Sequence, residues 1–143
     1  MKKMITTIFI ILFSIKAFCP INRVLYIERS EPVRPYEKIW NATCSVESMF
    51  NPYAIGDLNL RYKSYGIVQI RQSRLDDYYL KTGIRYTITD MFDPDISKEI
   101  FMYYAIQYHP LQLEYIARSW NGGNKGIHKK STINYWKKIK RYL

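Results

Sequence analysis

One glutamate in this sequence has neighbours that suit it to acid–base chemistry. Glu47 lies within the segment V-E-S-M-F-N-P-Y-A at 46–54, where most neighbouring side chains are apolar or small. Upstream, apolar and small residues recur every three or four positions, at Tyr36, Ile39, Trp40, Thr43 and Cys44. This spacing predicts an amphipathic helix over 36–50, which the Asn-Pro pair at 51–52 would end because a residue before proline avoids the α region.

The predicted position of Glu47, in the last turn of that helix, would change the acidity of its carboxyl group. Burial disfavours the ionised form and the negative end of the helix dipole disfavours it further, so both effects raise the pKa. A carboxylic acid that stays protonated near neutral pH can serve as a general acid. The alternative is a solvated carboxylate at a helix end, since Asp and Glu are rarely buried. Other motifs along the chain favour the first interpretation.

Three such motifs follow Glu47. They are S-Y-G-I-V-Q-I at 64–70, A-R-S-W-N-G-G at 117–123 and Y-W-K-K-I at 135–139. In this order, and together with E-S-x-x-N-P-x-A at 47–54, they closely resemble the motifs of the soluble lytic transglycosylase family. The family pattern is E-S-x-x-N-P-x-A, G-L-M-Q-I, A-Y-N-A-G and Y-V-x-K-I. This family (glycoside hydrolase family 23, the SLT domain) consists of lysozyme-like enzymes that cut the glycan strands of peptidoglycan.

The resemblance implies a reaction for Glu47. As the single catalytic acid of the family, it would protonate the glycosidic oxygen between N-acetylmuramic acid and N-acetylglucosamine. It would then remove the proton from the C6 hydroxyl of the muramic acid, which closes a 1,6-anhydro ring and admits no water. One carboxyl group would serve both steps, unlike the two-carboxylate scheme of most glycosidases.

The resemblance also assigns substrate-binding roles to the motif at 64–70. Ser64 would orient the N-acetyl group and the C6 region of the sugar. Gly66 would let the backbone approach the sugar closely. Gln69 would bind sugar hydroxyls or hold Glu47, because its amide both donates and accepts hydrogen bonds.

Further binding residues come from the later motifs and from one helix. Trp120, which replaces the tyrosine of the family, would line the cleft, and Asn121 would bind the sugar or the loop backbone. Tyr135 matches a tail tyrosine that the family uses near the catalytic glutamate. Tyr103 is a candidate by its helical position, to one side of the apolar stripe and free to face a groove.

Asp57 leaves a second reaction open. It could be the second carboxylate of a hydrolysing muramidase on the same fold, where it would position a water molecule. An aspartate after a glycine is otherwise simply a turn residue. A non-catalytic wall-binding module and a membrane-active cationic protein are two further alternatives.

Composition favours a folded, basic domain with an anionic partner. The chain has 143 residues, enough for one domain, and its 22 Lys and Arg against 12 Asp and Glu give a formal net charge of +10. That charge suits an anionic polymer such as the cell wall. We expect no nucleic-acid partner, because aromatic residues at helical spacing more often form a core than stack on bases. The two histidines have no Cys or carboxylate pattern beside them, so we expect no metal site, and the resemblance implies no cofactor.

The N-terminus indicates export. Residues 1–19 have a basic start, an apolar run and a small-x-small end, as in a secretory signal peptide, and the run is short for a membrane span. We therefore expect a secreted, periplasmic or envelope-facing monomer that serves wall turnover, a secretion apparatus, or viral entry or exit. Cys19 and Cys44 could pair if cleavage precedes Cys19; otherwise Cys44 would pack in the core.

The predicted organisation is a signal peptide at 1–19, an extended leader at 20–35 and a lysozyme-like domain at 36–143. Hydrophobic spacing predicts five helices, at 36–50, 67–81, 96–108, 111–120 and 131–142. Gly83 would end the second helix as a C′ glycine. Residues 64–66 could form a short β element. The predicted fold class is mainly α, lysozyme-like, with about five helices and at most a small β element.

Overall fold

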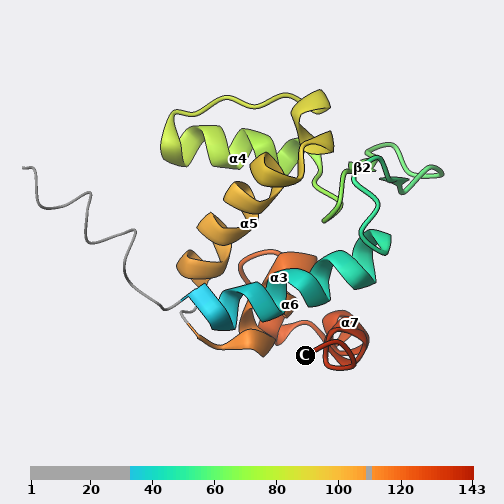
Figure 1. Ribbon diagram of the computed structural model, residues 1–143, viewed down its shortest axis with the longest axis vertical. Coiled ribbons are helices and arrows are strands. Elements are labelled where there is room, and N and C mark those ends of the chain that lie inside the picture. Colours follow the sequence, from blue (N-terminus) through green and yellow to red (C-terminus); the bar gives the residue numbers. More distant parts are fainter. Residues whose placement is uncertain (1–32, 109–110) are drawn as a thin grey trace, which may run out of the picture. The chain divides into compact units, whose positions relative to one another are not determined.

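Figure 1 shows a computed structural model of the chain, which describes residues 33–108 and 111–143. The helices are α3 (Val33–Ser48), α4 (Gln72–Thr82), α5 (Pro94–Tyr108), α6 (Leu113–Gly122) and α7 (Ile133–Ile139). The strands β1 (Ile55–Gly56) and β2 (Ser64–Tyr65) form an antiparallel hairpin. Short 3-10 helices are η1 (Thr89–Phe92), η2 (Gly126–His128) and η3 (Lys130–Thr132). This architecture confirms the predicted mainly α class with a small β element. The predicted signal peptide and Cys19 lie outside the described residues.

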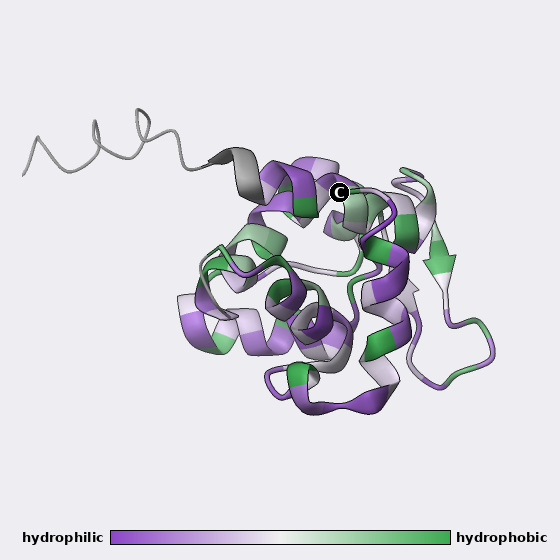
Figure 2. Cartoon of the chain, turned by 90° about the horizontal axis from the view of Figure 1, so that it is seen from below, coloured by the Kyte–Doolittle hydropathy of each residue, from purple (hydrophilic) through white to green (hydrophobic). Residues whose placement is uncertain are grey.

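The core is built around α6, which packs against α3, α5 and α7. Five consecutive residues of this helix, 116–120, are buried, so α6 is covered on every side. Hydrophobic and hydrophilic residues alternate along the helices (Figure 2). Aromatic rings join the layers, since Phe101 of α5 meets both Trp40 of α3 and Trp120 of α6 edge to face. Burial of such apolar faces is the main source of helix stability in a domain of this kind.

The helix that carries Glu47 differs from the predicted one at both ends. α3 begins at Val33, within the segment predicted as leader, and ends at Ser48, not at residue 50. Met49 and Phe50 both have positive φ, 53° and 63°, and these left-handed residues turn the chain before the Asn-Pro pair is reached. Glu47 nevertheless lies in the last turn, as predicted. Cys44 is buried in the same helix, and burial raises the pKa of its thiol to about 12.

The predicted helix over 67–81 is wrong in its first third. Residues 66–69 form a turn, closed by two backbone hydrogen bonds between Tyr65 and Ile70 of 2.9 and 2.8 Å, and α4 begins only at Gln72. The apolar residues Ile67, Val68 and Ile70 are buried, but as parts of this turn. Short apolar runs do not distinguish a helix from other buried backbone, which explains the error. The predicted end is confirmed: Gly83 caps α4 with φ 76°.

The remaining boundaries shift by a few residues. α5 begins at Pro94, because proline fits the first helical position. α6 runs to Gly122 and therefore includes Asn121. The last predicted helix, over 131–142, is shortened to α7, and η3 forms its approach. Within the described part of the chain, no helix is long and apolar enough to cross a membrane.

Candidate active site

A pocket of about 410 Å³ opens beside Glu47. It is bordered by the end of α3, the β hairpin with its following turn, the start of α4 and the end of α6, through residues Glu47, Asp57, Ser64, Gln69, Ile70, Arg71, Ser73, Arg74, Trp120, Asn121 and Gly123. Five of the predicted site residues are in this set: Glu47, Ser64, Gln69, Trp120 and Asn121. The described residues contain no group of three or more His, Cys, Asp or Glu side chains that could hold a metal ion.

Glu47 is half-buried at this pocket, and its carboxyl group is a weak acid. Burial raises the pKa of Glu47 to about 7, against the opposing effects of a hydrogen bond from Tyr135 and of the cations of Arg71 and Lys138. The nearby Asp57 carboxylate raises that pKa further. Glu47 therefore keeps its proton up to about neutral pH, which is the property a general acid needs.

Tyr135 of α7 orients the Glu47 carboxyl. Its hydroxyl donates a hydrogen bond of 2.7 Å to Glu47 Oε1. The ring is buried, and burial together with the neighbouring Glu47 raises the pKa of the phenol well above its usual value, so it remains a donor. The contact joins residues 88 positions apart in the sequence, so it forms only when α7 docks on α3.

A buried arginine holds the approach to α7 in place. Arg118 of α6 donates hydrogen bonds to Thr132 Oγ1 at 2.9 Å and to the Lys129 carbonyl at 3.1 Å, and forms an ion pair with Glu114 at 2.9 Å. Thr132 immediately precedes α7. Because these partners satisfy the guanidinium inside the protein, the network fixes the start of the helix that carries Tyr135.

Gln69 organises the hairpin side of the pocket. Its Nε2 donates to the carbonyls of Gly66 at 2.8 Å and Ala54 at 3.2 Å, and its Oε1 accepts a hydrogen bond of 2.8 Å from the Ser64 hydroxyl. Ser64 and Gln69 thus line the pocket as one hydrogen-bonded unit. Ser48 plays a related part that the sequence analysis missed, because its hydroxyl donates to the Ile67 carbonyl at 2.8 Å and ties α3 to the same turn.

Three predicted site residues lie outside the pocket lining: Tyr135, which contacts Glu47 as described above, Gly66 and Tyr103. Gly66 has φ 76°, and a Cβ added there would lie 1.9 Å from the Met91 carbonyl oxygen. Glycine is required here because the backbone packs closely against η1. The predicted reason was a close approach of the backbone to a sugar. Tyr103 packs edge to face on Tyr78 with ring centroids 5.1 Å apart, so its ring supports the α4–α5 contact.

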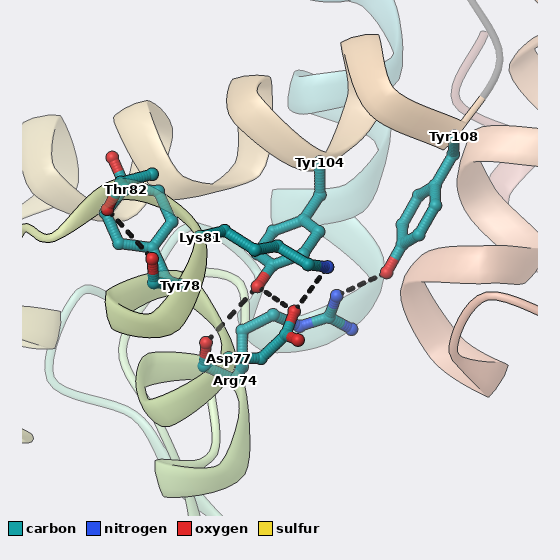
Figure 3. A network of polar contacts seen from close by, with 7 residues as sticks. All are labelled: Arg74, Asp77, Tyr78, Lys81, Thr82, Tyr104 and Tyr108. Atoms are coloured by element: carbon teal, nitrogen blue, oxygen red, sulfur yellow. Dashed lines mark hydrogen bonds and ion pairs between the residues drawn. The ribbon is translucent and has the colours of Figure 1, made fainter.

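Arg74 joins the pocket to the helices behind it. Its guanidinium lies 4.5 Å from the ring centroids of both Trp120 and Tyr104, and it donates to the Tyr108 hydroxyl at 2.5 Å and the Trp120 carbonyl at 2.9 Å. Figure 3 shows this arginine beside Asp77 and Lys81 on α4, facing the tyrosines of α5. Trp120 is held from the other side by a hydrogen bond of 3.3 Å from its Nε1 to the Val68 carbonyl.

Asp57 faces the pocket in a charged pair. It accepts hydrogen bonds from Arg71 Nε at 3.1 Å and Nη2 at 2.6 Å, and this guanidinium is the main cause that holds the pKa of Asp57 below its usual value. Arg71 and Arg74 were not predicted, because both lie just beyond the motif at 64–70. The pocket therefore combines a protonated acid, Glu47, with an ionised carboxylate, Asp57. Their different surroundings shift the two pKa values in opposite directions.

Comparison with known proteins places this geometry in a family. Residues 35–143 match the family model described as transglycosylase SLT domain. A chain of the crystal structure of Tapes japonica lysozyme is 27% identical, with a TM-score of 0.62, over 73% of this chain and 88% of that one. A chain of the crystal structure of Aeromonas hydrophila PliI in complex with Meretrix lusoria lysozyme has the same TM-score and coverage at 24% identity, which supports the fold alone. No curated protein matches significantly.

The matched residues, 35–143, include all but the first two residues of α3 and the whole of the other four described helices. They also include every residue that lines the pocket. It agrees with the resemblance found in the motifs at 47–54, 64–70, 117–123 and 135–139. The solved lysozymes show that the described architecture is lysozyme-like. The chain therefore belongs to the transglycosylase SLT domain family and is a lysozyme-like enzyme of the peptidoglycan-cleaving class.

Proposed function

We propose that this protein is a lytic transglycosylase that cleaves the β-1,4 bond between N-acetylmuramic acid and N-acetylglucosamine. The observation that carries the proposal is the Glu47 carboxyl, half-buried at the pocket with a pKa of about 7 and a hydrogen bond from Tyr135. Such an acid can protonate the leaving oxygen as the glycosidic bond breaks. The anionic form of Glu47 that results is stabilised by the Tyr135 hydroxyl and by the cations of Arg71 and Lys138.

In the second step Glu47 accepts a proton from the muramic acid C6 hydroxyl. The C6 oxygen then bonds to C1 of the same sugar, which closes the 1,6-anhydro ring and regenerates the acid. Glu47 ends with the proton it started with, so the carboxyl is a catalyst and no water is consumed. Ser64, Gln69, Trp120 and Asn121 line the pocket and are proposed to bind the sugars. An aromatic ring, amides and a hydroxyl in one pocket lining can bind a sugar through its ring face and its hydroxyls.

Hydrolysis by a muramidase is the second candidate, and Asp57 is the observation that favours it. This carboxylate lines the same pocket as Glu47 and its pKa is lowered, so it is ionised when Glu47 is protonated. An acid and a carboxylate on one pocket can direct a water molecule to the anomeric carbon. The pairing of Asp57 with Arg71 weakens this candidate, because both hydrogen bonds of the guanidinium end on Oδ2 and compete with a water molecule for that oxygen.

Mass spectrometry of digested peptidoglycan separates the two reactions. Our proposal predicts fragments with 1,6-anhydromuramic ends, each lighter by one water than the fragment with a reducing end. Reducing ends in the wild-type digest, lost on Asp57→Asn, would establish hydrolysis instead. A protein that binds cell walls and releases no fragment of either kind would be a wall-binding module.

Tyr135→Phe should shift the pH dependence of cleavage. The Tyr135 hydrogen bond lowers the pKa of Glu47, so its loss raises that pKa and the acid stays protonated to higher pH. The basic limb of the kcat/KM profile should therefore move to higher pH. The rate at the optimum should fall by about 10-fold, because the ionised form of Glu47 loses a charge-assisted hydrogen bond. If the basic limb stays at the same pH, Tyr135 does not control the protonation of Glu47 in the reaction.

The cellular setting is also a proposal. The basic charge of the chain suits an anionic wall, and the signal-like segment at 1–19 favours a secreted or periplasmic enzyme that acts as a monomer in the envelope. Wall turnover, insertion of a secretion apparatus and viral passage through the wall would all use the same reaction.

A further inference from the structure

A second hollow, also of about 410 Å³, lies between the end of α3 and the end of α7. Glu47 lines this hollow as well as the pocket described above, so the two adjoin at the candidate acid. The hollow is also lined by Met49 from the end of α3, and by Lys138, Arg141 and Tyr142 from α7 and the turn that follows it. A glycan bound across Glu47 would have this hollow on one side.

The hollow carries two cations on one face. Lys138 and Arg141 are three residues apart, and the turn bonds from Lys140 N to Trp136 O and from Arg141 N to Lys138 O continue α7 past its end. Residues at this spacing project from the same side of a helix. Both side chains therefore face the space beside Glu47.

These cations form no ion pair among the described residues, and the nearest carboxyl to act on either of them is Glu47, whose pKa Lys138 lowers. The ion pairs there use Arg71, Lys81, Lys98 and Arg118, while Lys138 and Arg141 form neither an ion pair nor a side-chain hydrogen bond. Glu47 is the only acidic residue that lines the hollow. Because it keeps its proton up to about neutral pH, the hollow has a net positive charge.

We propose that this hollow binds a carboxylate of the peptide attached to muramic acid, with Lys138 and Arg141 as the residues that recognise it. The inference rests on the proposed function. The N-acetylated sugar rings are neutral, so the nearest anions to the scissile bond are the carboxylates of the peptide on the muramic acid. Arginine and lysine are the side chains that pair with carboxylates. Met49 and Tyr142, exposed by 86% and 56%, offer apolar surface to the rest of the peptide.

The test compares two forms of one substrate. Peptide-bearing glycan strands are cleaved either intact or after their carboxylates have been converted to methylamides, which keeps the peptide and removes its charge. The wild type should prefer the intact strands by about 5-fold in kcat/KM, a size typical of two partly exposed ion pairs. The preference should decrease at high salt. Equal rates on the two substrates would overturn the inference. This comparison uses the wild-type protein alone.

A pair of double variants locates the effect. Lys138→Ala/Arg141→Ala should reduce the preference to about 1, whereas the matched control Lys137→Ala/Lys140→Ala, which removes the same charge from the same helix outside the hollow, should retain it. Equal loss in both variants would show a general charge effect and would reject the site.

A binding measurement separates this inference from the proposed function. If the wild type cleaves neither substrate, the proposed function fails, and calorimetry with an isolated muropeptide then tests the hollow alone. Tighter binding of the intact muropeptide than of its methylamide, by about 5-fold, supports the site. Equal binding of the two overturns it.

Discussion

Glu47→Gln is expected to lower peptidoglycan cleavage by about 10³-fold or more, because glutamine cannot deliver or accept the proton that both steps require. Removal of a group that acts twice in one cycle should cost more than removal of a single-step acid. Release of soluble fragments from purified sacculi measures the effect. For the wild type the same assay should show a basic limb near pH 7, above which the pKa of Glu47 leaves most of the carboxyl ionised.

Stability distinguishes lost chemistry from lost structure in this variant. The pKa of Glu47 is raised in the folded protein from 4.5 to about 7, so the folded state binds the proton more tightly than the unfolded state does. The wild type therefore loses stability as the pH rises from about 4.5 to 7, and the total loss is roughly 3 kcal/mol. Glutamine does not titrate. Glu47→Gln should match the wild type at pH 4 and exceed its free energy of unfolding at pH 8.

Glu37→Gln is the matched control for that experiment. Glu37 lies on the same helix, outside the pocket, and forms an ion pair with Lys98 of 2.7 Å. Its replacement makes the same change of side chain and should change stability by no more than about 1 kcal/mol, with cleavage retained. An inactive Glu37→Gln would mean that the charge of α3, and not the acid at its end, governs the reaction. A Glu47→Gln protein that digests sacculi at the wild-type rate would end the acid–base mechanism.

The sequence was sufficient to predict a half-buried Glu47 with a raised pKa in the last turn of α3, since both depend on local helical spacing. Its role in the reaction stays a prediction. Periodicity also predicted the five helices of the described residues, and the sequence predicted the cap at Gly83. It did not predict the turn at 67–70, because a buried turn and a buried helix present the same run of apolar residues. Arg71 and Arg74 were not predicted either, because both lie just beyond the motif at 64–70.

Other features of the site depend on contacts that no local pattern encodes. The proximity of Tyr135 to Glu47 was anticipated only because the tail motif resembles that of a known family, and the hydrogen bond between them was not predicted. The Asp57–Arg71 pair and the hollow at the end of α7 form between segments distant in sequence. Tyr103 is half-buried beside the apolar stripe and packs on Tyr78 of α4, a contact that helical spacing did not predict.

Gly66→Ala is expected to have the largest effect on stability of the substitutions considered, roughly 3–5 kcal/mol. Alanine at φ 76° costs about 1–2 kcal/mol by itself. The new Cβ would in addition lie 1.9 Å from the Met91 carbonyl oxygen, which is backbone and cannot rotate away. η1 and the hairpin must then separate. Because Gln69 donates to the Gly66 carbonyl, the pocket wall should move with them and cleavage should fall as well.

Gly83→Ala isolates the clash from the strain of the dihedral angle. Gly83 has the same φ of 76°, but a Cβ added there has no atom within 4 Å. Only the left-handed conformation is penalised, so the cost should be about 1–2 kcal/mol. Thermal unfolding followed by circular dichroism should give a Tm for Gly66→Ala that is lower than that of Gly83→Ala by roughly 10 °C. If the two variants unfold together, the contact with Met91 is not what requires glycine at position 66, and close approach to the substrate becomes the better explanation.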